Sequence, residues 1–554
     1  NEVMPKQDYI KLPSVTDADL LSVISTDVLS QDKNAAEISI LLRNPAFDKI
    51  EAVSIQYFDS VVTEQIDNAD GTSLIKVKLT NPSRYISAYG LNSITATSKV
   101  GNTYTTDFAS GTVVLNISMY REVNSEQEWL NMKNNPNDNF KLMKDLDFTG
   151  FTNPIITTTM TGKIDGNNHT IRNMIVNTSE GIAFRVFQGS LFNLYFEDVK
   201  KTNNSDESGL IGYLQSSATV RNVHIKNITL MLGYYTGGIA ALSRYSSNIQ
   251  NSSVTNLKII DRANVNGMRV GGLVGQMEQS NIMNSYVQDL HFDLANSSQF
   301  YAVGGLVGYN NYGVIDSAYT TGEINTTYPN AGGIVGLNYG RVENVISNIR
   351  LISSQVYAGG IIGNDVNDNV SNTLFTGELY TSVENEIHRT IGNKNLNNHN
   401  FYAWASQRIN GVISNNGASE ELLTTQELND SKTYSTKINI GNNFSYDDIG
   451  NNKLPKLYYD NVKELLPNQN DNYLNITDGV PLKIKEITAK KDLTSADVSI
   501  LVSNADVNRY KITGVAIADI EEFGEGDVKI YNEDSGIADT SLIRVTIRPK
   551  YYLD

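Results

Sequence analysis

Apolar residues in the middle of this chain occur in short runs that alternate with polar residues, and the runs recur at nearly constant spacing. The stretch from Arg221 to Ile228 shows this alternation, with Val223 and Ile225 on either side of a histidine. A period of two is typical of β-strands, whereas an amphipathic helix repeats every ~3.6 residues. The pattern therefore predicts short strands, and self-similarity at a period of about 20–50 residues indicates a repeat architecture.

The clearest repeat is a glycine-bounded pentad, Gly304-Gly305-Leu306-Val307-Gly308. Its second position recurs at residues 209, 238, 272, 305, 333 and 360, at steps of 29, 34, 33, 28 and 27. A unit of about 30 residues cannot bury its own apolar face, whereas copies stacked on one another can. We therefore predict an all-β fold built on a right-handed parallel β-helix, or solenoid, over residues 139–410.

A second column of residues, mostly asparagines, runs in phase with the pentads. In a parallel stack with strands about 4.8 Å apart, an amide at the same turn of each coil can donate to one neighbour and accept from the other. Asp316 interrupts the series, because an ionised carboxylate does not donate; Asp316→Asn is therefore predicted to be neutral or stabilising by about 1 kcal/mol. The alternative is a catalytic or metal-binding aspartate. The column consists of Asn193, Asn222, Asn251, Asn284, Asp316, Asn344 and Asn372.

The pentad also carries two adjacent apolar residues, which point to opposite faces if the segment is a straight strand. If the Leu/Ile column faces the core, the next residues form an outer apolar stripe, and such stripes usually mark contact surfaces. We expect another part of the chain or a separate domain to cover it; the alternative is a modestly exposed valine stripe. The candidate partner-contact residues are Ile211, Val274, Val307, Val335 and Ile362.

Strand-like segments without pentads flank the repeats. Residues 1–118 predict a β-sandwich of immunoglobulin-like topology. Residues 498–547 partly repeat that pattern, so residues 473–554 are expected to form a second β-sandwich. Either this copy is shorter than the first or its last strands lie beyond Asp554. A helical cap and linker at 119–138 and a C-terminal cap and linker at 411–472 complete the organisation.

One short helix is predicted between the first sandwich and the repeats, from Asn124 to Met132. Ser125 and Glu128 form a capping-box pattern, and Trp129 supplies an apolar side chain. The end coil of a parallel stack has an open apolar face and unpaired strand edges. We expect the helix to lie over that face; the alternative is an ordinary connecting helix.

Composition and charge limit the kinds of partner that this chain is expected to bind. The 554 residues carry a formal net charge of −17, which argues against binding nucleic acid or anionic membrane surfaces. No apolar stretch is long enough to insert in a membrane. The chain contains no cysteine, which excludes disulfides and thiolate sites and suits an extracellular, Gram-positive bacterial surface protein.

Candidate chemical sites are few. The five histidines are His169, His224, His291, His388 and His399. His224 and His291 are interpreted as strand side chains rather than metal ligands. The acidic run from Asp519 to Asp527 satisfies the requirements of a calcium loop only loosely, and a solvated loop is the alternative.

Two further possibilities concern carbohydrate or peptide ligands. Polysaccharide-cleaving β-helix enzymes need paired carboxylates on an exposed sheet, but the pentad segments are nearly free of charge. Repeated tyrosines either stack as filler or form a platform for carbohydrate or peptide. These tyrosines are Tyr213, Tyr309, Tyr312, Tyr319, Tyr328 and Tyr339.

The Gly-Gly-Leu/Ile-Val-Gly units resemble the GLUG repeats of bacterial surface proteins. The segments that lead into and out of the repeats, from Glu128-Trp129 to Phe148 and from Leu423 to Leu457, fit the same kind of region. Together with the flanking sandwiches, the arrangement is similar to the non-catalytic part of streptococcal immunoglobulin A1 proteases and related zinc metalloproteases.

This resemblance implies a cell-surface zinc endopeptidase whose His-Glu-x-x-His helix lies in a C-terminal domain. None of the five histidines begins such a motif, so no catalytic residue and no metal or cofactor site is assigned to this chain. Zinc is expected only in a longer parent protein. The implied partners are host immunoglobulin A1 and the parent's catalytic domain. The alternatives are an adhesin for host protein or glycan and, less strongly, a carbohydrate-active β-helix enzyme.

Overall fold

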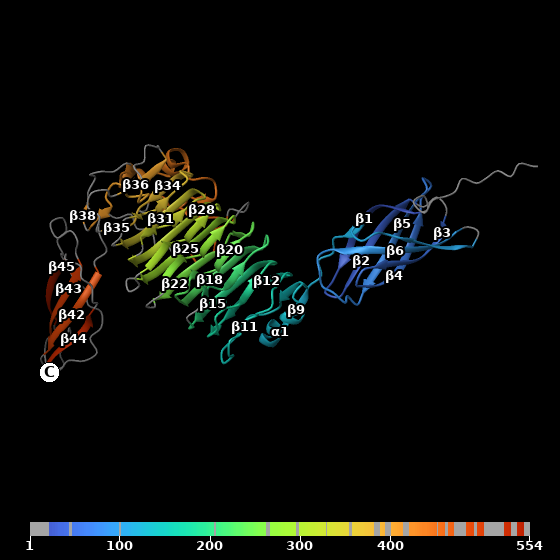
Figure 1. Ribbon diagram of the computed structural model, residues 1–554, viewed down its shortest axis with the longest axis horizontal. Coiled ribbons are helices and arrows are strands. Elements are labelled where there is room, and N and C mark those ends of the chain that lie inside the picture. Colours follow the sequence, from blue (N-terminus) through green and yellow to red (C-terminus); the bar gives the residue numbers. More distant parts are fainter. Residues whose placement is uncertain are drawn as a thin grey trace, which may run out of the picture. The chain divides into compact units, whose positions relative to one another are not determined.

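The computed structural model is almost entirely β-structure (Figure 1). It forms two compact units: residues 1–146, 158–170 and 189–194, and residues 147–157, 171–188 and 195–554. Strands β12 (Lys163–Arg172) and β15 (Ser190–Lys201) contribute residues to both. The structure describes residues 21–43, 47–98, 101–203, 206–261, 266–294, 299–327, 329–353, 357–381, 388–393, 400–410, 412–413, 420–450, 453–459, 464–469, 483–491, 496–503, 526–532 and 540–547.

The first unit begins with two antiparallel sheets around one apolar core, which makes it a β-sandwich. One sheet has the order β1-β2-β5-β4, and the other has β3-β6-β7 with β8 paired to β6. Alternation along β5 places Ile75, Val77 and Leu79 in the core, each fully buried. The strands are β1 (Ser22–Gln31), β2 (Ala35–Arg43), β3 (Phe47–Ile55), β4 (Asp59–Asp67), β5 (Thr72–Thr80), β6 (Tyr89–Ser98), β7 (Thr103–Asp107) and β8 (Val114–Leu115).

The short helix predicted after the sandwich is present as α1 (Glu126–Asn131), followed by a single 3-10 turn, η2 (Met132–Asn134). The Ser125 side chain accepts a hydrogen bond from the backbone N–H of Glu128, which caps the helix. Trp129 is fully buried. Beside the helix, β9 (Arg121–Val123) pairs in parallel with β10 (Phe140–Leu142), and β10 pairs with β12.

The second unit contains the stack of coils predicted from the pentads. Each regular coil contributes one strand to each of three sheets, and each strand pairs in parallel with its counterpart in the next coil; β24, for example, pairs with β20 and β27. This arrangement confirms the parallel β-helix. The first sheet contains β14 (Phe184–Phe187), β17 (Ile211–Leu214), β20 (Ala240–Arg244), β24 (Val274–Glu278), β27 (Val307–Asn311), β30 (Val335–Asn338) and β33 (Ile362–Asp365).

The other two sheets complete each coil. The second contains β16 (Glu207–Ser208), β19 (Tyr235–Gly237), β23 (Asn266–Gly271), β26 (Gln299–Gly304), β29 (Asn330–Gly332) and β32 (Tyr357–Gly359). The third sheet includes β12 and β15, whose ranges are given above. Its other strands from β11 to β39 are β11 (Leu146–Asp147), β13 (Ile175–Val176), β18 (Thr219–Met231), β21 (Asn248–Gln250), β22 (Ser253–Ile260), β25 (Asn281–Leu294), β28 (Val314–Thr326), β31 (Arg341–Ser353), β34 (Val370–Phe375), β35 (Glu378–Thr381), β36 (Phe401–Trp404), β37 (Arg408–Ile409), β38 (Val412–Ile413) and β39 (Glu421–Leu423).

The pentad is a corner between the second and first sheets, not a straight strand. In one coil β23 ends at Gly271 and β24 begins at Val274, so the chain bends at the two residues between them. A Cβ on Gly272 would lie 2.2 Å from the carbonyl oxygen of Gly305, and one on Gly305 would lie 2.1 Å from that of Gly333. Glycine is therefore required where the corners of successive coils approach each other.

This bend corrects the expectation of an outer apolar stripe. Side chains alternate between faces within a strand, but this alternation does not continue across a corner. Consequently both apolar residues of each pentad are buried, and the structure offers no exposed stripe at these positions. The five candidate contact residues, all with an exposed fraction of 0%, are Ile211, Val274, Val307, Val335 and Ile362.

The amide column exists, with one change of membership. Asn284 donates to Asn251 Oδ1, Asn372 donates to Asn344 Oδ1 at 3.0 Å, and these asparagines have a left-handed backbone. In the register of β25 and β28, however, the residue opposite Asn284 is Ser317, with φ of 56°, rather than Asp316.

Asp316 lies one residue before the corner, and its Oδ1 accepts from Ser317 Oγ at 2.9 Å and from Asn344 Nδ2 at 2.7 Å. The short serine side chain does not reach back to Asn284, whose Oδ1 is buried without a hydrogen-bond partner in the described part of the chain. The column is thus interrupted at Ser317, while Asp316 bridges part of the gap by accepting from the next coil.

A segment after the last coil covers one side of the stack. This strap, residues 425–469 apart from 451–452 and 460–463, contains α2 (Thr425–Leu428), the π-helical turn η3 (Thr433–Ile438), β40 (Phe444–Ser445) and β41 (Lys456–Leu457). It does not stay over the final coil, because the Tyr459 hydroxyl reaches Asn222 Oδ1 at 2.7 Å. Under the strap lies a covered column, in which each residue is opposite the next in the strand register: Tyr286, Tyr319, Ile346, Leu374 and Tyr402.

The last described strands form an antiparallel sheet of order β44-β42-β43-β45, and a second sandwich in this region stays a prediction. Most of the acidic run from Asp519 to Asp527 lies outside the described residues, and only Gly526 and Asp527 fall within β44. Tyr328 and His399 also lie outside the described residues. The strands of this sheet are β42 (Lys483–Lys491), β43 (Ala496–Ser503), β44 (Gly526–Asn532) and β45 (Thr540–Ile547).

Candidate functional site

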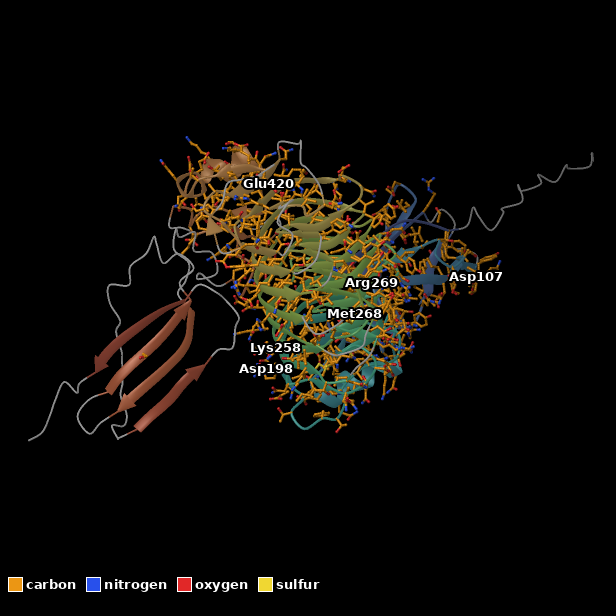
Figure 2. All side chains as sticks on the ribbon, turned by 60° about the vertical axis from the view of Figure 1, so that its left-hand side comes forward. Asp107, Asp198, Lys258, Met268, Arg269 and Glu420 are labelled. Atoms are coloured by element: carbon orange, nitrogen blue, oxygen red, sulfur yellow. The ribbon has the colours of Figure 1, made fainter. Side chains whose placement is uncertain are left out.

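A group of tyrosines surrounds one arginine on the first and second sheets of the β-helix. We call this group the Tyr–Arg surface; its members are Tyr234, Tyr235, Arg269, Tyr301, Tyr309, Tyr312 and Tyr339. Figure 2 labels Arg269, which follows the buried Met268 on β23. Strand pairing places Arg269 opposite Tyr235 on one side and Ala302 on the other. The surface is therefore built by stacking coils, and its members come from four of them.

The guanidinium of Arg269 lies against several rings at once. Its Cζ is 4.5 Å from the centroid of Tyr301, 4.8 Å from that of Tyr234, 5.4 Å from that of Tyr235 and 6.0 Å from that of Tyr309. All four distances are within the range of cation–π attraction. The arginine also donates from Nη1 to the carbonyl oxygen of Gly267 at 3.0 Å, which fixes its direction.

The rings continue beyond the arginine in two edge-to-face contacts and one tilted contact. Tyr301 and Tyr309 have centroids 5.3 Å apart, Tyr309 and Tyr339 are 5.8 Å apart, and Tyr312 and Tyr339 are 6.2 Å apart. Such pairs stabilise aromatic side chains without hiding both faces of each ring. Tyr312 is 61% exposed, whereas Tyr301, Tyr309 and Tyr339 are partly buried.

Burial is the main cause of the altered ionisation here. It raises the pKa of Tyr309 to about 12, with smaller contributions from Tyr301 and Tyr339. Burial also raises the pKa of Tyr235, although Arg269 opposes the change. Both hydroxyls thus remain protonated at neutral pH and can donate hydrogen bonds.

The tyrosines that the sequence suggested as a possible ligand platform lie in different parts of the structure. Tyr309, Tyr312 and Tyr339 come together on this surface, whereas Tyr319 belongs to the covered column. Tyr213 lies instead beside Arg244, whose Cζ is 5.5 Å from its ring, and its hydroxyl donates to Glu207.

Sequence reasoning missed Arg269, Tyr234, Tyr235 and Tyr301. The signal was available in the residues just before each pentad. Tyr235 and Arg269 each stand two residues before the first pentad glycine, and Tyr301 stands three before it. Because the coils are in register, Tyr235 and Arg269 share a face. Tyr301 stands at a register shift, between the residues opposite Met268 and Arg269.

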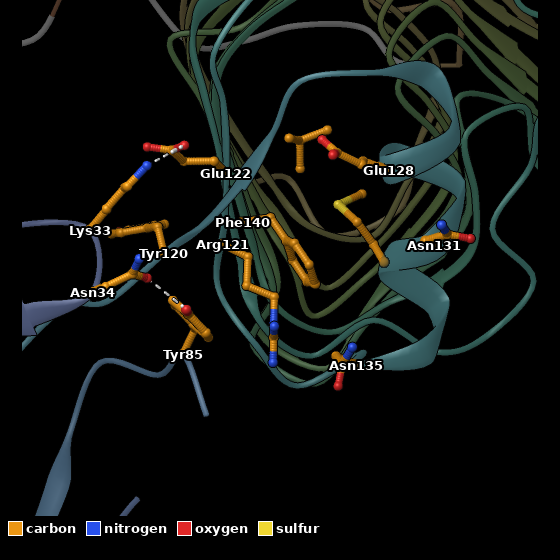
Figure 3. Close-up of a pocket in the computed structure, with 12 residues that line it drawn as sticks. Lys33, Asn34, Tyr85, Tyr120, Arg121, Glu122, Glu128, Asn131, Asn135 and Phe140 are labelled. Atoms are coloured by element: carbon orange, nitrogen blue, oxygen red, sulfur yellow. Dashed lines mark hydrogen bonds and ion pairs between the residues drawn. The ribbon is translucent and has the colours of Figure 1, made fainter. Parts of the chain in front are cut away.

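A second site, in the first unit, is a cavity of about 330 Å³ between a sandwich turn and the α1 region (Figure 3). Its charged groups have partners within the protein. Lys33 pairs with Glu122 at 3.5 Å, and Arg121 Nε donates to Asp138 Oδ2 at 2.7 Å while its Cζ lies 4.4 Å from the centroid of the Tyr85 ring. The cavity is therefore bordered by a junction of paired charges.

The histidines occupy different surroundings. His224 is buried between coils, where Nδ1 lies 2.8 Å from Ser253 Oγ and Nε2 lies 2.8 Å from Asn222 Oδ1. Desolvation lowers the pKa of His224 to about 3, so the ring is neutral. His291 is exposed, between Lys258 and Glu323 in the strand register. The described residues contain no cluster of three or more His, Asp or Glu side chains arranged to hold a metal ion.

Fold and surface together define a class: a parallel β-helix repeat protein with flanking antiparallel sheets and a tyrosine-rich face. No helix in the described residues is long and apolar enough to cross a membrane.

Within that class, the chain is similar to immunoglobulin A1 protease from Streptococcus sanguinis, with 24% identity over 254 residues. That alignment covers 42% of this chain and 14% of the relative, and it establishes a distant homology. A solved structure of an IgA1 protease matches with a TM-score of 0.37 and 16% identity, covering 66% of this chain and 28% of that chain. No family model matches the sequence. The chain thus spans about a seventh of the curated relative.

Proposed function

We propose that this chain is the non-catalytic scaffold and substrate-recognition region of a secreted, cell-surface zinc metalloprotease that cleaves host immunoglobulin A1 or a related host glycoprotein. The observation that carries the proposal is the distant homology to immunoglobulin A1 protease over 254 residues. The sequence contributes no His-Glu-x-x-His motif, so the zinc and its ligands would belong to a longer parent protein.

The β-helix supports the recognition part of the proposal. Stacked parallel coils hold surface side chains at fixed separations, and a rigid scaffold lowers the entropic cost of binding a partner. The Tyr–Arg surface offers partly exposed tyrosines and an arginine, which are residue types enriched among the main contributors to protein interfaces.

The test is to immobilise the whole chain and measure binding of human immunoglobulin A1 by surface plasmon resonance, with immunoglobulin G as the control. In parallel, gel electrophoresis after prolonged incubation checks for cleavage of the heavy chain. The proposal predicts selective binding without cleavage. Cleavage by the chain alone would refute the non-catalytic role, and equal binding of both antibodies would refute selective recognition.

The alternative is an adhesin that binds a host protein or glycan and has no protease attached. The reading frame of the parent gene separates the two. A His-Glu-x-x-His motif downstream of Asp554 is the outcome that the protease proposal requires, and a complete reading frame without that motif would favour the adhesin.

A further inference from the structure

Arg269 differs from a comparable arginine on the same stack. Arg350 also lies over a tyrosine ring, with its Cζ 4.9 Å from the centroid of Tyr380. In addition, Arg350 pairs with Glu323 at 2.8 Å and with Glu378 at 3.2 Å. The guanidinium of Arg350 is therefore stacked on an aromatic ring and also paired with carboxylates from the coils on both sides of it.

Arg269 has the aromatic part of that environment without the carboxylates. It makes no ion pair with any described residue, its Nε is buried without a hydrogen-bond partner, and its one protein acceptor is the carbonyl oxygen of Gly267. An arginine carries five N–H donors in a planar fork that matches a carboxylate. The chain has a net charge of −17, so most of its surface repels anions. A guanidinium without a carboxylate partner among the described residues is therefore a local site that can attract an anion.

We propose that the Tyr–Arg surface binds an acidic sugar, with the ligand's carboxylate on the Arg269 guanidinium and its pyranose faces against the neighbouring tyrosine rings. The rings supply flat apolar faces, and their protonated hydroxyls supply donors for sugar oxygens. This assignment goes beyond the proposed function and does not depend on it, because it concerns a ligand class and not the parent enzyme.

The surrounding charges favour a single negative charge on the ligand. Glu207 and Glu278 are close enough to influence the ionisation of Tyr235 beside Arg269. A phosphorylated or sulfated polymer would place several charges near these carboxylates, and one arginine would not compensate for the repulsion. A sugar with one carboxylate fits this balance better.

The experiment titrates the whole chain with sialyllactose, using lactose as the neutral control, and follows ligand signals by saturation-transfer NMR. We expect saturation of the carboxylate-bearing ring and no comparable signal from lactose. Arg269→Met should weaken binding by at least about tenfold, the loss expected for one charge-assisted, bidentate contact. The matched control is Arg221→Met, because Arg221 is an exposed arginine on the third sheet.

A second variant keeps the test valid if Arg269→Met disturbs the fold. Tyr312 is 61% exposed and has a φ of 58°. Tyr312→Asn removes the ring and introduces a residue type that tolerates this left-handed backbone conformation. It should weaken binding several-fold with an unchanged circular dichroism spectrum. Absence of sialyllactose binding, equal binding of lactose, or full binding by a folded Arg269→Met variant would each overturn the proposal. So would preference for an acidic peptide over the sugar.

Discussion

Two sets of tyrosines project from the same stack of coils, and their surroundings differ completely. In the covered column Tyr286 and Tyr319 stack with centroids 4.7 Å apart, and both are at most 1% exposed beneath the strap. On the Tyr–Arg surface, Tyr301 and Tyr309 meet edge to face and remain partly exposed. The repeat places tyrosines on both faces, but a segment distant in sequence decides which of them become core.

The polar atoms of the two sets differ in the same way. In the covered column the Tyr402 hydroxyl donates to the carbonyl oxygen of Lys437 at 2.7 Å, and that of Tyr319 donates to Gln469 at 3.1 Å. Tyr309 donates a long bond of 3.3 Å to Asn311, which belongs to the same strand and not to a covering segment. Hydroxyls that anchor a strap are unavailable to a ligand, whereas those on the Tyr–Arg surface can exchange partners.

The largest expected effect separates the two sets by stability. Tyr319→Ala removes a buried ring and leaves a cavity beneath the strap, so it should lower the free energy of unfolding by about 3–4 kcal/mol. The matched variant Tyr309→Ala should cost about 1 kcal/mol, because its ring is only partly buried. Urea unfolding followed by Trp404, which packs against this cluster, measures both. Equal losses would contradict the distinction.

Arginines provide the next comparison. Asp138 is fully buried and accepts from Arg84 at 2.9 Å and from Arg121 at 2.7 Å, whereas Arg269 has no carboxylate among the described residues. Asp138→Asn should destabilise the first unit by about 2 kcal/mol, less than a fully buried pair would lose because both arginines are about a third exposed. Denaturation followed by Trp129 measures this loss. A loss of the same size in Arg269→Met would contradict the assignment of Arg269 to binding.

A smaller effect is expected at the interrupted amide column under the strap. Ser317→Asn places a long amide where φ is 56°, with a donor for the unpartnered Asn284 Oδ1. It should raise the free energy of unfolding by about 1 kcal/mol. Asp316→Asn should be close to neutral, since Asp316 lies beside the corner and already accepts two hydrogen bonds. Thermal unfolding of both variants is the measurement, and a destabilised Ser317→Asn would contradict the corrected column.

The smallest effect is a dependence of stability on alkaline pH. Burial raises the pKa of Tyr309 to about 12 from an ordinary value of 10.0, so the folded state keeps a proton that the unfolded state has lost. Its contribution is complete below about pH 10 and is lost as the pH rises towards 12. Tyr309→Phe should make the unfolding free energy depend slightly less on pH between about pH 10 and pH 12. An unchanged slope would indicate that Tyr309 titrates as an exposed residue.

The repeat geometry was predictable, because the spacing of glycines and asparagines reports the length of each coil. The pentad corner was not, because two adjacent apolar residues look alike whether the backbone is straight or bent between them. The position of Ser317 was hidden for a related reason: Asp316 resembles an asparagine in the alignment of coils, and only the strand register shows that the next residue occupies the left-handed corner.

The candidate site was only partly predictable. Tyr309, Tyr312 and Tyr339 were recognised as a potential platform, but nothing local to the sequence separates them from Tyr319, which the strap covers. Arg269 was missed because its significance depends on the rings that meet it from other coils and on the absence of a carboxylate partner among the described residues. Contacts between distant segments decide both points.

The most direct test of the difference between the two tyrosine sets is hydroxyl-radical footprinting of the intact chain with peptide mass spectrometry. The account predicts ready oxidation of Tyr312, with measurable oxidation of Tyr301, Tyr309 and Tyr339. Tyr286 and Tyr319 should be protected until the chain is unfolded. Rapid oxidation of Tyr286 and Tyr319 in the native protein, or protection of Tyr312 to the same degree, would contradict it.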